Sequence, residues 1–111
     1  MSRQIPQAEI DAAKAARPDR RLVILTPDDD DRDEFLFAVP KAAEYQKFRT
    51  MVLDDETKAG ALRVLVDGCV ITPSPAEFAL ITQDHPGFNE TFGGQLLRLA
   101  GAGVGVTVKK V

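Results

Sequence analysis

The stretch of sequence with the most obvious chemical potential is PDDDDRDE, residues 27–34, which holds six carboxylates. A calcium loop needs oxygen ligands at alternating positions, a glycine at the sharp turn and a distant bidentate Glu. Here four aspartates are consecutive, Arg32 interrupts the run and no glycine lies within it. Neighbouring side chains of an extended segment point to opposite sides, so they cannot all reach one ion. The run therefore predicts a solvated hairpin turn and no metal site.

The only cysteine, Cys69, and the only histidine, His85, could in principle form a thiolate–imidazolium pair. Cys69 falls on the apolar stripe of its predicted helix, where cysteine is usually a small core residue. His85 lies in DHPG, a segment that ends a helix. One cysteine and one histidine also fall short of the four ligands of a structural zinc site. We therefore expect no catalytic residue, no metal and no cofactor.

Composition narrows the class of protein further. The chain has 111 residues, enough for one domain with a real core, and a net charge of −3. That charge, with no Trp and one Tyr, argues against nucleic-acid binding. No apolar stretch approaches the roughly 18–20 residues of a membrane span, and the first residues lack the apolar core of a secretory signal. We expect a globular, cytoplasmic protein that binds neither nucleic acid nor membrane.

The first half of the chain predicts a helix and a β-hairpin. Residues 7–16 are rich in alanine but contain only one large apolar residue, so this helix should be frayed or docked on a partner. We accordingly treat residues 1–20 as a separate, mobile arm. Residues 21–26 and 33–39 have the composition of strands, and Phe35, Phe37 and Val39 share one face. Two strands alone are marginal in water, so that face must lie on helices.

The second half predicts four helices. Helix 41–53 has Tyr45 and Phe48 on one stripe, and helix 56–71, with Asp54 and Asp55 offering an N-cap, is the best amphipathic match. Helix 74–83 has a capping box starting at Ser74. The last helix, 88–100, aligns its apolar residues and ends before a glycine. The tail, residues 102–111, either adds a short strand through its alternating valines or remains mobile.

Together these segments predict an α+β fold, an N-terminal β-hairpin packed on a small bundle of about four α-helices, with a single domain over residues 21–101. Large apolar side chains are spread over the hairpin and the helices. Either they share one core, or some of them line a groove for a partner helix. The candidate partner-binding residues are Tyr45, Phe48, Phe78, Phe88, Phe92 and Leu96.

An ordered series of motifs in residues 21–101 resembles the small tail assembly chaperones of long-tailed bacteriophages and prophages. A hairpin around an acidic turn leads to AVPKAAEYQKF, then to LVDGCVITPSPAEF, and finally to HPGFNETFGGQLLRLAG. The N-terminal helix and the GVGVTVKKV tail are not part of this pattern. The resemblance implies a non-enzymatic protein of the host cytoplasm that coats the apolar helices of the tape measure protein. It also implies contact with tail tube subunits, weak homo-oligomers, and absence from the mature virion.

Two other classes of function stay open at this point. The first is a different phage or bacterial interaction protein, such as a tail-completion protein, a head–tail connector or a small regulator. The second is a small enzyme that uses Cys69 or an acidic metal site. The reactivity of the Cys69 thiol separates the enzyme from the binding proteins, because a buried thiol is inert.

Overall fold

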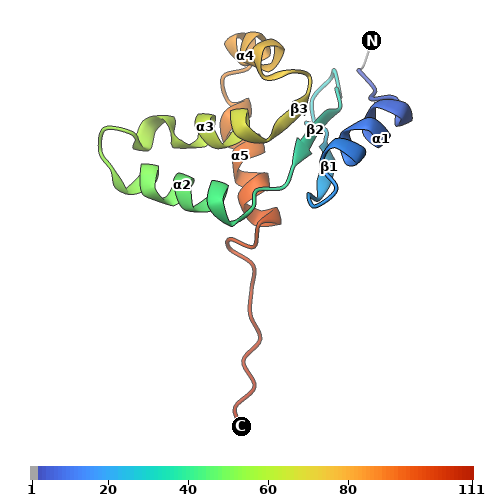
Figure 1. The fold of residues 1–111 in the computed structure, drawn as a ribbon. Helices are drawn as coiled ribbons and strands as arrows, with labels where there is room; N and C mark the ends of the chain where they lie inside the picture. The colour runs from blue at the N-terminus through green and yellow to red at the C-terminus, as the bar shows by residue number, and fades with distance from the viewer. Residues whose placement is uncertain (1–2) are drawn as a thin grey trace.

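The computed structural model describes residues 3–111 and has an α+β fold, as the sequence predicts. A three-stranded antiparallel sheet carries helices on both faces (Figure 1). The elements in chain order are α1 (Gln7–Ala16), β1 (Leu22–Leu25), β2 (Phe35–Ala38), α2 (Ala42–Leu53), the short 3-10 helix η1 (Lys58–Gly60), α3 (Ala61–Cys69), β3 (Val70–Thr72), α4 (Pro75–Asp84) and α5 (Phe88–Leu99).

The predicted β-hairpin is present, and β2 is the central strand of the sheet. β1 pairs with β2 from Leu22 opposite Ala38 to Leu25 opposite Phe35. β3 pairs with the other edge of β2, with a register irregularity at Leu36 and Phe37. Every residue of β2 is buried, because helices cover the sheet on both sides. β1 is left as an edge strand.

The prediction of one continuous helix over residues 56–71 is wrong. The chain makes a turn and the single turn of η1 first, and α3 then ends at Cys69, where β3 begins. Val70, Ile71 and Thr72 are β-branched, and Pro73 disfavours helical backbone at the residue before it. The N-cap of α3 is Gly60, while Asp54 accepts a 2.9 Å hydrogen bond from the Glu56 N–H within the preceding turn.

The main core lies between the sheet, α3, α4 and α5. Phe35 and Phe37 project from β2 into this core, and their rings contact those of Phe78 and Phe92 at centroid distances of 4.9–6.0 Å. Such pairs add about 0.5–1.5 kcal/mol beyond the burial of their area. The buried members of this core are Phe35, Phe37, Leu65, Val66, Cys69, Val70, Phe78, Phe92 and Leu96.

The opposite face of the sheet is covered by α1, which is neither frayed nor a separate arm. Ile5 and Ala13 are buried against Leu36 of β2 in a second, smaller cluster. The end of the acidic run holds the residues that precede α1. The Ile5 N–H donates to Glu34 Oε1 at 2.8 Å, and the Arg3 N–H donates to Asp33. These contacts dock α1 and the residues before it on the sheet.

The last two helices begin and end close to the predicted positions. Ser74 caps α4 by accepting a 3.3 Å hydrogen bond from the Glu77 N–H. The helix α5 passes close to α3 at Gly93, where an added methyl group would lie 2.7 Å from Leu62 Cδ2. Gly101 follows α5 with a φ of +106°, a conformation that favours glycine.

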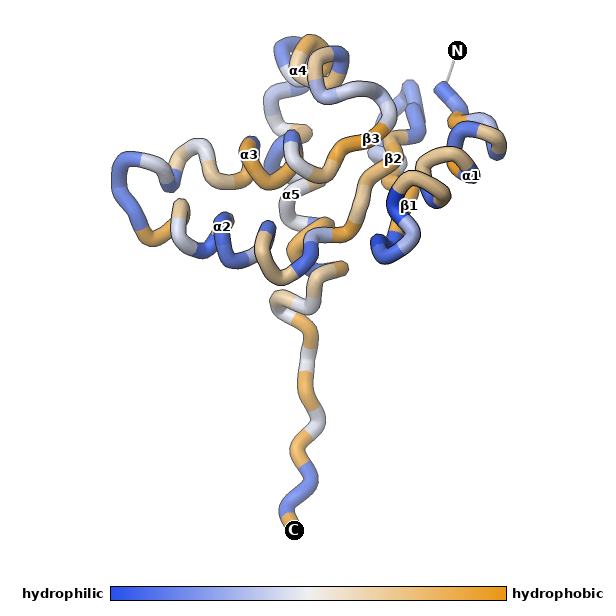
Figure 2. The backbone as a smooth tube through the Cα atoms, viewed as in Figure 1, coloured by the Kyte–Doolittle hydropathy of each residue, from blue (hydrophilic) through white to orange (hydrophobic). Residues whose placement is uncertain are grey.

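The tail forms no strand within the chain, so the alternative of an added C-terminal strand is wrong for this structure. After Ala102 its residues have no regular structure and are exposed, and they lead away from the body (Figure 1). Valines alternate with less hydrophobic residues along its length (Figure 2). A period of two is not sufficient for a strand when no neighbouring strand supplies hydrogen bonds.

Candidate functional site

The acidic run is the predicted hairpin turn, and four of its carboxylates, those of Asp28, Asp29, Asp33 and Glu34, have partners within the chain. Arg32, with a φ of +49°, turns back so that its guanidinium contacts Asp28 at 2.9 Å and its N–H donates to Asp29. Asp33 and Glu34 hold the N-terminal segment. Across residues 3–111, no three side chains of the His, Cys, Asp and Glu types gather as a metal ion would require.

Cys69 and His85 have different partners. Cys69 is buried, and its thiol donates to Glu44 Oε2 over 3.9 Å. Burial, aided by the charge of Glu44, raises the pKa of the Cys69 thiol to about 12, which keeps it protonated at neutral pH. His85 is exposed and stacks on the ring of Phe88 at 4.7 Å. This thiol therefore has the character of a core residue.

Three of the six candidate partner-binding residues are core residues and cannot contact a partner. Phe78, Phe92 and Leu96 are at most 2% exposed. The sequence signal was ambiguous, because an apolar stripe on a helix looks the same whether it faces the core or a partner. Tyr45, Phe48 and Phe88 are half-buried and retain accessible surface.

Accessible apolar side chains lie at several places on the protein, and two of them, Leu53 and Val64, belong to the helical hairpin formed by α2 and α3. No residue of α2 is fully buried, although the helix lies beside α3 (Figure 1). Between the two helices is a pocket of about 90 Å³ with an almost entirely apolar lining. Its walls are formed by Glu44, Lys47, Phe48, Met51, Ala61, Val64, Leu65 and Gly68.

Phe48, a candidate predicted from the sequence, lines this pocket, whereas Val64 and Gly68 were not predicted to contribute. Val64 lies outside the buried stripe of α3 and is 36% exposed. Gly68 has no atom within 4 Å of the place where a side chain would begin, so its lack of a side chain leaves this position of the hairpin open. A glycine that interrupts an otherwise good amphipathic helix was the available signal.

The N-terminal end of α2 is held firmly by charged groups. Glu44 accepts a 2.9 Å hydrogen bond from the Lys41 N–H and forms a 2.8 Å ion pair with Arg20. Lys41 also pairs with Asp19, and its hydrogen bond lowers the pKa of that carboxyl. The far end of α2 has no such anchor, and Leu53 there is 78% exposed.

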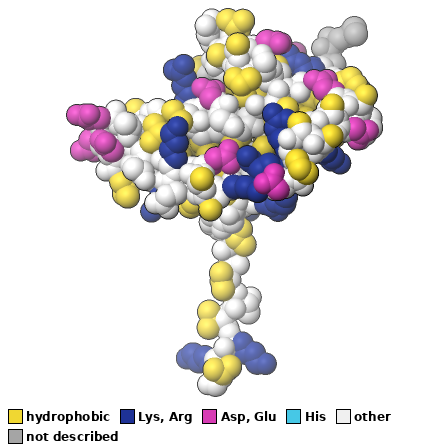
Figure 3. Space-filling model, viewed as in Figure 1, with side chains coloured by type: hydrophobic (Ala, Val, Ile, Leu, Met, Phe, Trp, Pro, Cys, Tyr) yellow, Lys and Arg dark blue, Asp and Glu magenta, His cyan; other side chains and the backbone are white. Residues whose placement is uncertain are grey.

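This arrangement can bind an apolar side chain. A cavity of roughly 150 Å³ is enough for benzene, so the smaller pocket suits one aliphatic side chain. Charged and apolar side chains alternate over the surface around the hairpin (Figure 3).

Residues 3–111 contain no helix both long and apolar enough to cross a bilayer.

Comparison with known families places the chain in one of them. A family model described as a domain of unknown function, DUF6848, matches residues 21–109. The chain belongs to the DUF6848 family. The match begins at β1, so α1 lies outside the part of the chain that defines the family.

A solved structure of uncharacterised protein rbstp2171 from Bacillus stearothermophilus is similar to this member of the DUF6848 family. The TM-score is 0.72 with 18% identity, over 90% of this chain and 99% of the other. At that identity the similarity establishes a shared fold. No curated protein matches the chain significantly.

Proposed function

We propose that this protein is a non-enzymatic chaperone of phage tail assembly, and that it binds amphipathic helices of the tape measure protein. The pocket between α2 and α3 carries the proposal, because it is apolar, accessible and lined by helices. A helix docks in such a groove through apolar residues spaced three or four apart. The order of motifs over residues 21–101 supports the same class of function.

The small size of the pocket fits a reversible contact. Burying one leucine side chain contributes about 1.5–3 kcal/mol, which gives weak binding at a single site. Many copies on one long helical protein would together shield it, and each copy could still be released. On this proposal the protein acts in the host cytoplasm and is absent from purified particles. Its detection in particles at a fixed stoichiometry would favour the connector alternative.

The direct test is co-expression with the proposed partner, a long, helix-rich tape measure protein. We expect the wild type to raise the soluble fraction of that protein. Gly68→Leu should remove the effect because the new side chain would occupy the pocket, whereas Gly68→Ala should retain it. Thermal melting of both variants shows whether each still folds. Equal activity of the two variants, both folded, would rule out this pocket as the binding site.

A further inference from the structure

The outer edge of β1 has unused backbone hydrogen-bonding groups. The Val39 N–H donates to the Arg21 carbonyl at 2.9 Å, so Arg21, Val23 and Leu25 direct their backbone groups toward β2. In an antiparallel ladder the alternate residues, Leu22 and Ile24, then direct theirs away from the sheet. Within residues 3–111 these outward groups have no backbone partner in a turn or loop. The side chain of Ile24 is 39% exposed.

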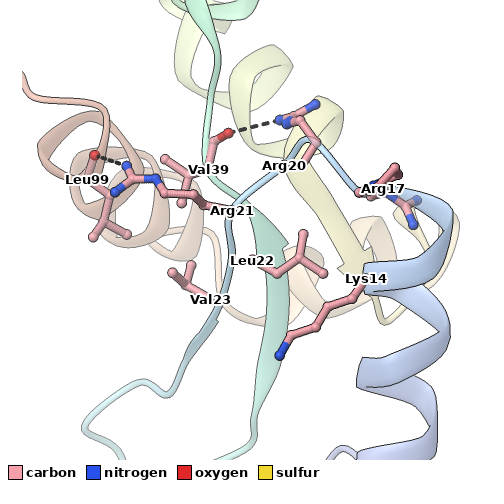
Figure 4. Close-up of a pocket in the computed structure, with 9 residues that line it drawn as sticks. Lys14, Arg17, Arg20, Arg21, Leu22, Val23, Val39 and Leu99 are labelled. Atoms are coloured by element: carbon pink, nitrogen blue, oxygen red, sulfur yellow. Dashed lines mark hydrogen bonds between the residues drawn. The ribbon is translucent and has the colours of Figure 1, made fainter.

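A groove of about 480 Å³ follows this edge at the start of β1. In Figure 4, β1 runs between α1 on one side and the end of α5 on the other, so the strand edge lies at the base of the groove. Leu22 and Val23 line it from the strand, and Leu99 lines it from α5. The shape suits an extended segment that adds to the sheet.

The rim of the groove is basic. Arg20 and Arg21 already donate hydrogen bonds to the carbonyls of Val39 and Leu99. Lys14 and Arg17, at the end of α1, also line the groove and form no ion pair with any residue from 3 to 111. The groove therefore favours an extended segment with carboxylates at one end.

The chain itself contains such a segment. β1 is preceded by the cations of the groove and followed by the aspartates of the hairpin turn. We propose that two copies pair their β1 edges in antiparallel orientation around a two-fold axis at Ile24, which forms a continuous six-stranded sheet. In this register Leu22 lies opposite Thr26 of the second copy, and Arg20 lies opposite its Asp28. The aspartates of each copy thus reach the basic rim of the other.

The charges select this arrangement over the parallel one. Parallel pairing would place the two acidic turns side by side, which is unfavourable. In the antiparallel dimer, the outward backbone N–H and C=O groups of Leu22 and Ile24 in each copy form hydrogen bonds with the other copy. The same residues thus make the contact on both sides, as an isologous dimer requires. The contact area is small, so we expect a weak, concentration-dependent dimer that salt weakens further. The α2–α3 pocket lies elsewhere, so this inference does not depend on the proposed function.

The first test is sedimentation equilibrium of the full chain over a range of concentrations. We expect the apparent mass to rise from 12.1 kDa toward twice that value, and the dissociation constant to increase at high salt. Ile24→Lys should weaken the dimer at least tenfold by placing a charge on the edge. Leu80→Lys, at a 63% exposed position of α4, is the matched control and should leave it unchanged. A monomer at every concentration overturns the proposal.

The second test exchanges charges between the two copies. Arg17→Glu and Asp28→Lys should each weaken self-association at least tenfold, because each puts like charges on the basic rim of one copy and the facing acidic turn of the other, at both ends of the dimer. An equimolar mixture of the two variants should form a heterodimer with nearly wild-type affinity, as native mass spectrometry can measure. Failure of the mixture to associate, with both variants folded by circular dichroism, overturns the antiparallel register.

The third test separates β1 from the other extended segment of the chain, the valine-rich tail. Val106 is 84% exposed, and Val106→Asp would prevent the tail from adding to an apolar sheet edge. We expect this variant to dimerise like the wild type. Loss of the dimer in Val106→Asp would instead make the tail the occupant of the groove and overturn the proposal.

Discussion

Glu44 connects three segments of the described chain. Its carboxylate contacts Arg20 before β1, the Lys41 N–H at the start of α2, and Cys69 at the end of α3. The side chains of Arg20 and Glu44 are 20% and 29% exposed, so solvent screens this pair only in part. A single carboxylate thus fixes where the α2–α3 hairpin leaves the sheet.

The burial of Cys69 predicts an unreactive thiol. In the native protein at pH 8 we expect no detectable reaction with a thiol-specific reagent, because the raised pKa leaves almost no thiolate. One thiol per chain should react after unfolding in denaturant. Rapid modification of the folded protein would contradict this assignment and restore Cys69 as a candidate nucleophile.

The same pKa shift predicts a loss of stability at alkaline pH. Above its ordinary pKa of 9.0 the thiol of the unfolded chain releases its proton, while the folded chain keeps it until about pH 12. The stability that Cys69 contributes is therefore complete below pH 9 and declines between pH 9 and 12. Cys69→Ala lacks this component, so its free energy of unfolding should fall less steeply over that range.

The neighbouring glycines of α5 should respond differently to the same substitution. Gly94→Ala is expected to raise the free energy of unfolding by about 0.5–1 kcal/mol, since its surroundings are open and alanine favours helix. Gly93→Ala would press on Leu62 Cδ2, so we expect it to be about 1 kcal/mol or more less stable than Gly94→Ala. Urea denaturation measures both; equal values would contradict the close α3–α5 approach.

At the scale of elements, α1 is the helix whose position the sequence predicted least well. Its alanine-rich composition indicated little burial, yet it packs on the second face of the sheet through Ala13 and the half-buried Ile10. The sequence gives no direct sign of this contact, because alanine suits exposed and buried helix positions equally. Leu36 and Ala38, which alternate with the two phenylalanines along β2, were the available indication that both faces are covered.

Substitutions at adjacent alanines of α1 test this packing. Ala13→Lys should lower the free energy of unfolding by about 1–3 kcal/mol, because Ala13 is buried against the sheet. Ala12→Lys, at the exposed neighbouring position, should change it by less than about 0.5 kcal/mol. Similar melting curves for the two variants would show that α1 is not docked in solution.

The sequence predicted the other elements wherever neighbouring residues determine the structure. The elements that it did not predict depend on contacts between distant segments. The hairpin and the capped start of α4 depend on nearby residues, so their patterns were sufficient. β3 was missed because three residues form a strand only when β2 pairs with them, a contact between distant segments. Of the residues that line the pocket, only Phe48 was a predicted candidate, since the accessible side of a stripe depends on the packing of both helices.

At the scale of the whole molecule, the α2–α3 pocket and the β1 edge are formed by different residues. We therefore expect the two activities to be separable. Ile24→Lys should abolish dimerisation and still raise the solubility of the long helix-rich partner, and Gly68→Leu should show the opposite pattern. Sedimentation and co-expression measure the two effects. Loss of both activities in either folded variant would mean that the surfaces are coupled.

The absence of any fully buried residue in α2 has a kinetic consequence. With its firm anchors confined to one end, this helix should open locally more often than the core, and its amide hydrogens should exchange with deuterium sooner than those of α5. A partner helix seated beside Phe48 would slow that exchange. Deuterium uptake would thus report occupancy of the pocket in the native protein without any substitution.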